Sequence, residues 1–222
     1  MTPLINVFVL TVGEQITMEA IKRLKKNTDR EFTLTVWYHP FEFNQDFFNK
    51  LQLETDDVIY CTKNQGTLSP GIFSQLGINF DYQVSCTADC LVNPGYMDKL
   101  LEPFKEDAVG MTGLTLQPSV KEPTDTVTPD NLTMISKEMI NEVGAVCPAF
   151  SRYGEEKFEF FKRIKEMGGK IVSIPYIGEH DSTKSEGRDQ MPDWRRELDK
   201  SCRLWLKIQK NNPTYNWWTN SI

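Results

Sequence analysis

Short apolar runs rich in β-branched residues recur along the first half of the chain, and helical patterns separate several of them. Ala20, Ile21 and Leu24 fall on one helical face, and Thr17 is the expected cap of that helix. Strands that alternate with helices predict an α/β domain with a mostly parallel sheet, flanked by helices on both faces. The predicted strands of this half are 4–11, 32–38, 58–62 and 82–87.

The second half continues the alternation. Gly144 is expected to end a short helix in the manner of a C-cap, and Phe158, Phe161 and Ile164 form the apolar stripe of a longer one. The predicted elements here are a strand at 108–116, helices at 136–143 and 155–167, a strand at 170–175 and a last helix that Asp193 can cap.

Composition and charge narrow the class of protein. A chain of 222 residues with 39% hydrophobic residues can bury a core of its own, and a net charge of −6 argues against a general nucleic-acid-binding face. Five scattered cysteines favour reduced, buried thiols over a disulfide framework. There is no apolar run long enough for a membrane span and no secretory signal. These features predict a cytoplasmic protein.

The segment VSCTADCLVNP raises the first question of chemistry, because a buried strand is predicted to end at a single carboxylate, Asp89. Ligands of open α/β sheets bind at the carboxyl ends of the strands, and a carboxylate there suits a hard cation. The alternative is a turn aspartate that caps the Asn93-Pro94-Gly95 segment. On this segment alone, both interpretations stay open.

Three further positions carry candidate chemistry. Glu155 and Glu156 begin a predicted helix, where one acid can serve as a general base, or both can simply stabilise the helix N-terminus. His180 follows a strand and precedes a loop, so it is a candidate metal ligand or a structural residue. His39 precedes a proline at a strand end, where it can stack on a ligand or shape a turn.

The order of these pieces is more specific than any one of them. The chain begins with a strand, which is followed by an N-x-G turn and by a strand that ends in D-x-(L/V)-x-x-P. The next motif in this order is VGAVCPAFSRYGEEKFEFFKRIKEMGGKIVSIPYIGEH. Over roughly residues 4–185, this order resembles the family 2 glycosyltransferases, which have the GT-A fold. The resemblance implies a GT-A domain over 1–185, with 186–222 as a C-terminal helical extension packed on it.

The resemblance also implies a role for each candidate. Asp89 and His180 would hold a divalent cation, Mn²⁺ or Mg²⁺, that neutralises the diphosphate of a nucleotide-sugar donor. Glu156 would deprotonate the acceptor hydroxyl, so that the sugar is transferred with inversion, and Glu155 would orient the site. A uridine diphosphate sugar is the expected donor. The acceptor hydroxyl would belong to a glycan, a protein or a modified nucleic-acid base.

Residues around the donor follow from the same resemblance. Lys184 and Arg188 lie in the loop after His180 and would close over the phosphates as a lid. The other expected donor-binding residues are Thr11, Gly13, Tyr38, His39, Asn64, Gly66, Thr87 and Ala88.

The sequence departs from the family pattern at four places. The usual D-x-D is replaced by Thr87-Ala88-Asp89, and the aspartate that usually ends the second strand is replaced by Trp37-Tyr38-His39-Pro40. Glu156 replaces an aspartate, and the asparagine expected after N-x-G is not apparent. The lost first aspartate leaves a second interpretation open. In that interpretation, a GT-A-like domain without turnover binds nucleotides or carbohydrates.

Overall fold

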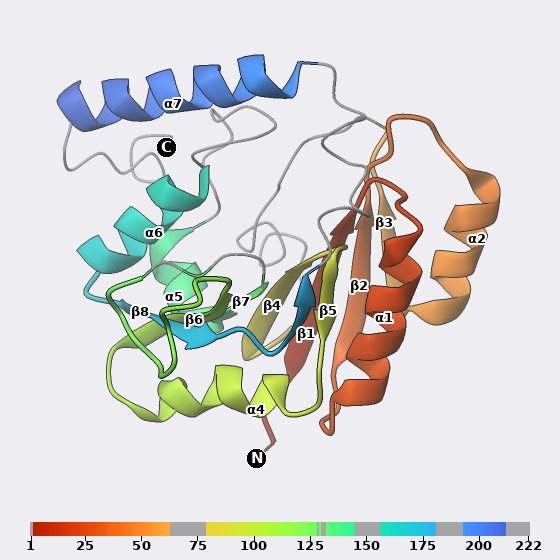
Figure 1. The fold of residues 1–222 in the computed structure, drawn as a ribbon, viewed down its shortest axis with the longest axis horizontal. Helices are drawn as coiled ribbons and strands as arrows, with labels where there is room; N and C mark the ends of the chain where they lie inside the picture. The colour runs from red at the N-terminus through yellow and green to blue at the C-terminus, as the bar shows by residue number, and fades with distance from the viewer. Residues whose placement is uncertain are drawn as a thin grey trace.

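The computed structural model places a seven-stranded sheet at the centre of the molecule, in the order β3-β2-β1-β4-β7-β6-β8 (Figure 1). Its strands are β1 (Ile5–Thr11), β2 (Thr33–Tyr38), β3 (Asp57–Tyr60), β4 (Tyr82–Thr87), β6 (Val109–Thr115), β7 (Leu132–Ser136) and β8 (Lys170–Pro175). The structure describes residues 2–62, 79–127, 129, 132–144, 156–180 and 193–211.

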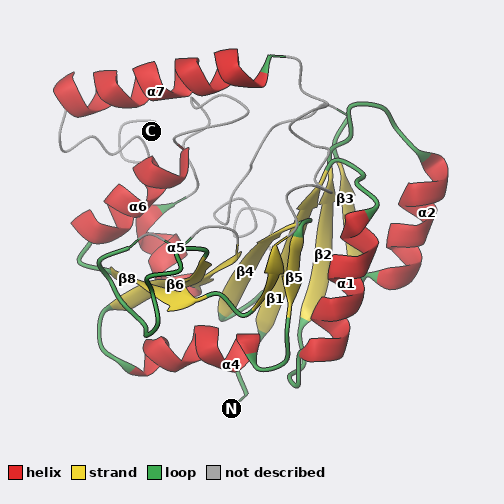
Figure 2. Ribbon diagram, in the orientation of Figure 1, coloured by secondary structure: helices red, strands yellow, loops and turns green. Residues whose placement is uncertain are grey.

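A second sheet of two short antiparallel strands lies beside the first, and helices surround both (Figure 2). Its strands are β5 (Cys90–Val92) and β9 (Gly178–His180). The helices are α1 (Ile16–Asn27), α2 (Gln45–Glu54), α4 (Tyr96–Leu101), the 3₁₀ turn η1 (Glu102–Lys105), α5 (Lys137–Val143), α6 (Glu156–Glu166) and α7 (Trp194–Asn211). In the described parts of the chain, no helix has the length and apolar character needed to span a bilayer.

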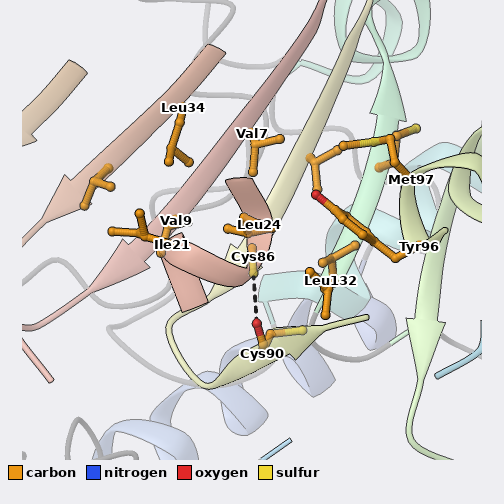
Figure 3. Packing of buried hydrophobic residues seen from close by; sticks show 14 of the residues in the cluster. Val7, Val9, Ile21, Leu24, Leu34, Cys86, Cys90, Tyr96, Met97 and Leu132 are labelled. Atoms are coloured by element: carbon orange, nitrogen blue, oxygen red, sulfur yellow. Dashed lines mark hydrogen bonds between the residues drawn. The ribbon is translucent and has the colours of Figure 1, made fainter. Parts of the chain in front are cut away.

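Alternation along the strands divides the core between the two faces of the large sheet. Val7 and Val9 face α1, α2 and α4, and this cluster includes Tyr96 and Met97 of α4 (Figure 3). Phe8 points to the other face, where the buried side chains of α5 and α6 complete a second cluster. A strand whose two faces are both buried has a nearly continuous run of apolar residues, and β1, with the sequence INVFVLT, follows this rule.

The mostly parallel sheet predicted from the sequence is confirmed. β1, β2, β3 and β4 form parallel pairs, and β6 pairs in parallel with β8. Two elements were not predicted from the sequence: α2, and β7, which runs antiparallel between β4 and β6.

Two local predictions were wrong. α1 begins at Ile16, and the Thr17 side chain is not its cap, because the Thr17 hydroxyl lies buried 2.7 Å from the hydroxyl of Thr11. Phe158 is 37% exposed, and Phe160 takes its expected place in the core. The buried stripe of α6 therefore consists of Phe160, Phe161 and Ile164.

A buried ion pair fixes α6 to the end of α5. Arg163 donates from Nε to Glu159 Oε1 (2.7 Å) and from Nη2 to Glu159 Oε2 (2.9 Å), and both side chains are 2% exposed. Arg163 also donates to the carbonyl oxygen of Val143, the last residue of α5. Burial raises the pKa of Glu159, and the arginine acts in the opposite direction. Each charge is thus kept in the interior by the other.

We expect Arg163→Ala to lower the free energy of unfolding by about 3–5 kcal/mol, because it leaves the Glu159 carboxylate buried without its cation. Urea denaturation measures the effect. Lys105→Ala is the control, since its ion pair with Glu102 is exposed on both sides and should contribute at most about 1 kcal/mol. The double variant Arg163→Met with Glu159→Leu should recover much of the loss. Equal losses for Arg163→Ala and Lys105→Ala would contradict this account.

Candidate functional site

The turn between β1 and α1 is held by a buried carboxylate. The Thr11 hydroxyl donates to Glu14 Oε2 (2.8 Å), and the amide of Val12 donates to the same oxygen (3.1 Å). The amide of Gly13 donates to the Thr11 hydroxyl (2.9 Å). Glu14 is 5% exposed, so this network fixes the turn from inside. Glu14 was not predicted as a site residue, because its only signal in the sequence is an acid that follows a glycine shortly after the first strand.

Gly13 lies against the end of β2. Its φ of +106° is a conformation that side chains rarely adopt, and a Cβ there would lie 3.3 Å from Cε2 of Tyr38. The amide of His39 donates to the carbonyl oxygen of Thr11 (3.0 Å), which joins the same two strand ends. The structure therefore brings together four of the expected donor-binding residues, Thr11, Gly13, Tyr38 and His39.

Tyr38 and His39 are buried, at 1% and 3% exposure. The Tyr38 hydroxyl accepts the amide of Asn44, and its ring belongs to an aromatic cluster at the ends of β2 and β3. The exposed rings of that cluster are Phe43 (42%) and Tyr60 (39%), whose centroids are 5.0 Å apart. The surface available for stacking is thus presented by Phe43 and Tyr60, which the sequence analysis did not single out.

The small sheet is attached to α1. Leu91 of β5 packs with Ile16 and Ala20, and the Asn27 side chain donates to the carbonyl oxygen of Val92 (2.7 Å). Arg23 lies 3.2 Å from the Glu179 carboxylate on β9. Both strands therefore rest on the helix that follows the β1 turn.

Asp89 and His180 meet at the end of this small sheet. β4 ends at Thr87, as predicted, and Asp89 lies in the two-residue turn before β5. Cys90 pairs with His180 in the β5–β9 register, and His180 Nε2 lies 3.2 Å from Asp89 Oδ2. The two side chains are 21% and 13% exposed, so this pair has access to solvent.

Two thiols lie beneath the turn. The Cys86 Sγ points to the carbonyl oxygen of Cys90 (Figure 3), and the Cys90 Sγ lies 3.3 Å from the Tyr176 hydroxyl. Contact with Cys90 and burial raise the pKa of Cys86 well above its ordinary value. Both cysteines are buried, and their contacts support the turn that carries Asp89.

The donor atoms fit a small oxygen-rich cation site. One carboxylate oxygen and one imidazole nitrogen come together, and Mg²⁺ in substrate-phosphate sites is often held by one or two protein ligands, phosphate oxygens and water. Among the described residues there is no group of three or more His, Cys, Asp or Glu side chains that could hold a metal by themselves. The buried Thr87 Oγ1 has no hydrogen-bond partner within the described chain, which leaves this hydroxyl available to a ligand.

The remaining candidates are placed in part or not at all. Glu156 is the first residue of α6, and only its backbone is described. Ala88 is buried in the turn beside Asp89. The candidates Asn64, Gly66, Glu155, Lys184 and Arg188 lie outside the described residues.

Comparison with solved structures identifies the architecture. A mannosyltransferase from Pyrobaculum calidifontis in complex with GDP-Man and Mn²⁺ matches with a TM-score of 0.63 and 15% identity, over 79% of this chain and 55% of that one. GalNAc-T7 with UDP, GalNAc and Mn²⁺ matches with a TM-score of 0.63 and 16% identity, over 80% and 45%. The chain has the GT-A fold. The fold class expected from the sequence is confirmed.

A third match is glucosyl-3-phosphoglycerate synthase from Mycobacterium tuberculosis, with a TM-score of 0.63 and 14% identity over 90% of this chain and 78% of that one. The chain spans about half the length of the first two structures, 55% and 45%. No family model matches the sequence, and no curated protein sequence matches it. At these identities the likeness establishes the fold alone.

His39 makes the stability of this site sensitive to acid. Burial lowers its pKa from 6.5 to about 4, so the unfolded chain takes up a proton at a higher pH than the folded one. Folding stability should therefore fall as the pH drops from 6.5 towards 4, by up to about 3 kcal/mol from this residue. Urea denaturation at several pH values should show a shallower loss for His39→Gln. If the free energy of unfolding fell equally with pH in His39→Gln and in the wild type, His39 would not be the source of the acid sensitivity.

Proposed function

We propose that this chain is an inverting glycosyltransferase of the family 2 type, which transfers a sugar from a nucleoside diphosphate donor to an acceptor hydroxyl. The observation that carries the proposal is the 3.2 Å approach of His180 Nε2 to Asp89 Oδ2, at the carboxyl end of β4 in a GT-A fold. Two residues far apart in sequence and both suited to a divalent cation meet where α/β sheets bind their ligands.

Asp89 and His180 would hold a Mn²⁺ or Mg²⁺ ion together with the donor diphosphate. When bound, such an ion neutralises charge on the leaving group. The turn fixed by Thr11 and Glu14, with Gly13 beside it, would accept the nucleotide, and Phe43 or Tyr60 offers an exposed ring for its base. A uridine diphosphate sugar is the first donor to examine.

Glu156 would act as the general base. Its position at the first turn of α6 favours the ionised carboxylate, because the helix dipole stabilises negative charge at that end. The acceptor O–H proton passes to Glu156 while the acceptor oxygen bonds to the anomeric carbon. The bond to the diphosphate breaks on the opposite face, which releases the nucleoside diphosphate and inverts the configuration. Glu155 would orient the acceptor, and Lys184 and Arg188 would cover the phosphates.

The proposed catalytic domain spans 1–185, and 186–222 forms an extension on it. Ser201, in the middle of α7, is only 1% exposed, which supports packing of this helix on the domain. A cytoplasmic setting is proposed on the cysteines, because Cys61, Cys86 and Cys90 are thiols that form no disulfide in the described chain.

A panel of nucleotide sugars tests the proposal, with nucleoside diphosphate release measured with and without Mn²⁺. We expect Glu156→Gln to lower the turnover number by about 10²- to 10⁴-fold with little change in donor affinity. Glu166→Gln, at the other end of α6 and ion-paired with Lys162, is the matched control and should keep wild-type turnover. Release of nucleotide from no donor would overturn the proposal. Donor binding without release would favour a binding module.

Asp89→Asn tests the cation site separately. The variant should weaken nucleotide binding in the presence of Mn²⁺ by about tenfold or more and remove the dependence of binding on the metal, because one oxygen ligand loses its charge. Isothermal titration calorimetry with UDP and Mn²⁺ provides the measurement. Asp98→Asn, which neutralises an exposed carboxylate paired with Arg30, should change neither the nucleotide affinity nor its dependence on Mn²⁺. Unaltered metal dependence in Asp89→Asn would remove this residue from the site.

A further inference from the structure

α7 carries a row of cations along one exposed face. Residues three or four apart share a face of a helix, and all five members of this row are exposed. The row consists of Arg196, Lys200, Arg203, Lys207 and Lys210. The first and last are fourteen positions apart, which corresponds to about 21 Å along the helix axis.

The opposite face of α7 is turned towards the protein. Ser201 is 1% exposed, and Leu198, Cys202 and Trp205 are half-buried. The cations of the row therefore point outward, because the apolar face is already occupied. Leu206 borders the row and is 63% exposed, the second largest exposure of a large apolar side chain in the described chain.

The charge of α7 contrasts with the charge of the whole chain. The helix has six basic and two acidic residues, a net charge of +4, in a chain of net charge −6. The rest of the chain is therefore at −10, and a negatively charged partner would be repelled by most of the molecule but attracted by this helix. Asp199 borders the row and pairs with Arg203 at 2.6 Å.

We propose that the basic face of α7 binds the anionic lipid surface of a membrane and attaches the protein peripherally. Clusters of four to eight Lys and Arg residues on an amphipathic helix suit acidic lipid headgroups. A straight row on a single helix touches a planar surface along its whole length, and the exposed Leu206 can enter the interface beside it. Nucleic-acid-binding domains are usually basic throughout, whereas the sequence pI here is about 5.1.

Vesicle co-sedimentation tests this inference, with phosphatidylcholine vesicles that contain or lack phosphatidylserine. We expect the wild type to bind only the anionic vesicles and to release them as salt is raised, because the attraction is screened. The variant R203Q/K207Q/K210Q should bind about a hundredfold more weakly, at roughly fivefold per cation. Circular dichroism should show both proteins folded, since the three side chains are exposed.

The matched control removes the same charge elsewhere. Lys22, Lys26 and Lys50 are exposed on α1 and α2, so K22Q/K26Q/K50Q changes the net charge equally and should keep wild-type binding. Equal losses for the two triple variants, or wild-type binding that ignores phosphatidylserine or salt, would overturn the proposal. Tighter binding to duplex DNA than to anionic vesicles would assign the face to nucleic acid instead. None of these binding measurements requires sugar transfer, so their outcome does not depend on the proposed function.

Discussion

The pairing of β5 with β9 depends on the missing side chain of Gly178. A Cβ at this position would lie 2.2 Å from the carbonyl oxygen of Leu91, closer than two such atoms can approach, and the φ of +148° also favours glycine. The close approach places His180 opposite Cys90, and therefore next to Asp89. The geometry of the candidate cation site thus follows from a backbone contact two residues away, and the protein alone brings the two candidate ligands together.

A second constraint acts on the other side of the large sheet. α6 begins at Glu156, and its orientation is fixed by the buried pair of Arg163 and Glu159 and by the bond from Arg163 to the end of α5. A charged pair in the interior is costly when one member is missing, so it selects a single arrangement of the two helices. The position of the proposed base is therefore linked to packing one to two turns further along the same helix.

Much of the fold could be predicted from the sequence, because apolar residues recur along its strands and helices in the patterns typical of each element. The continuous apolar run of β1 and the glycines after α5 and α6 gave correct elements. β7 was missed because this five-residue strand follows a proline-rich stretch and shows no alternation of its own. β5 was not predicted as a separate strand, because CLV continues the apolar pattern of β4 although it belongs to another sheet.

The candidate site was harder to predict, because its parts are joined by contacts that no local pattern encodes. The proximity of Asp89 and His180 was expected from a family resemblance, and neither spacing nor periodicity implies it. Glu14 looked like an ordinary turn residue, since burial of a carboxylate depends on the neighbouring hydroxyl of Thr11. The cations of α7 were visible in the sequence, but only the exposure of each one shows that they form one outward row.

The distance in sequence between β5 and β9 has a consequence for the growing polypeptide. During synthesis, Asp89 emerges long before Gly178, and until then β5 has no partner strand to receive its hydrogen bonds. The last strand of the large sheet, β8, ends at Pro175, just before β9 begins at Gly178. The pair of Asp89 and His180 would therefore be among the last parts of the domain to assemble. A chain that ends shortly before Gly178 would keep every strand of the large sheet and still lack the paired site.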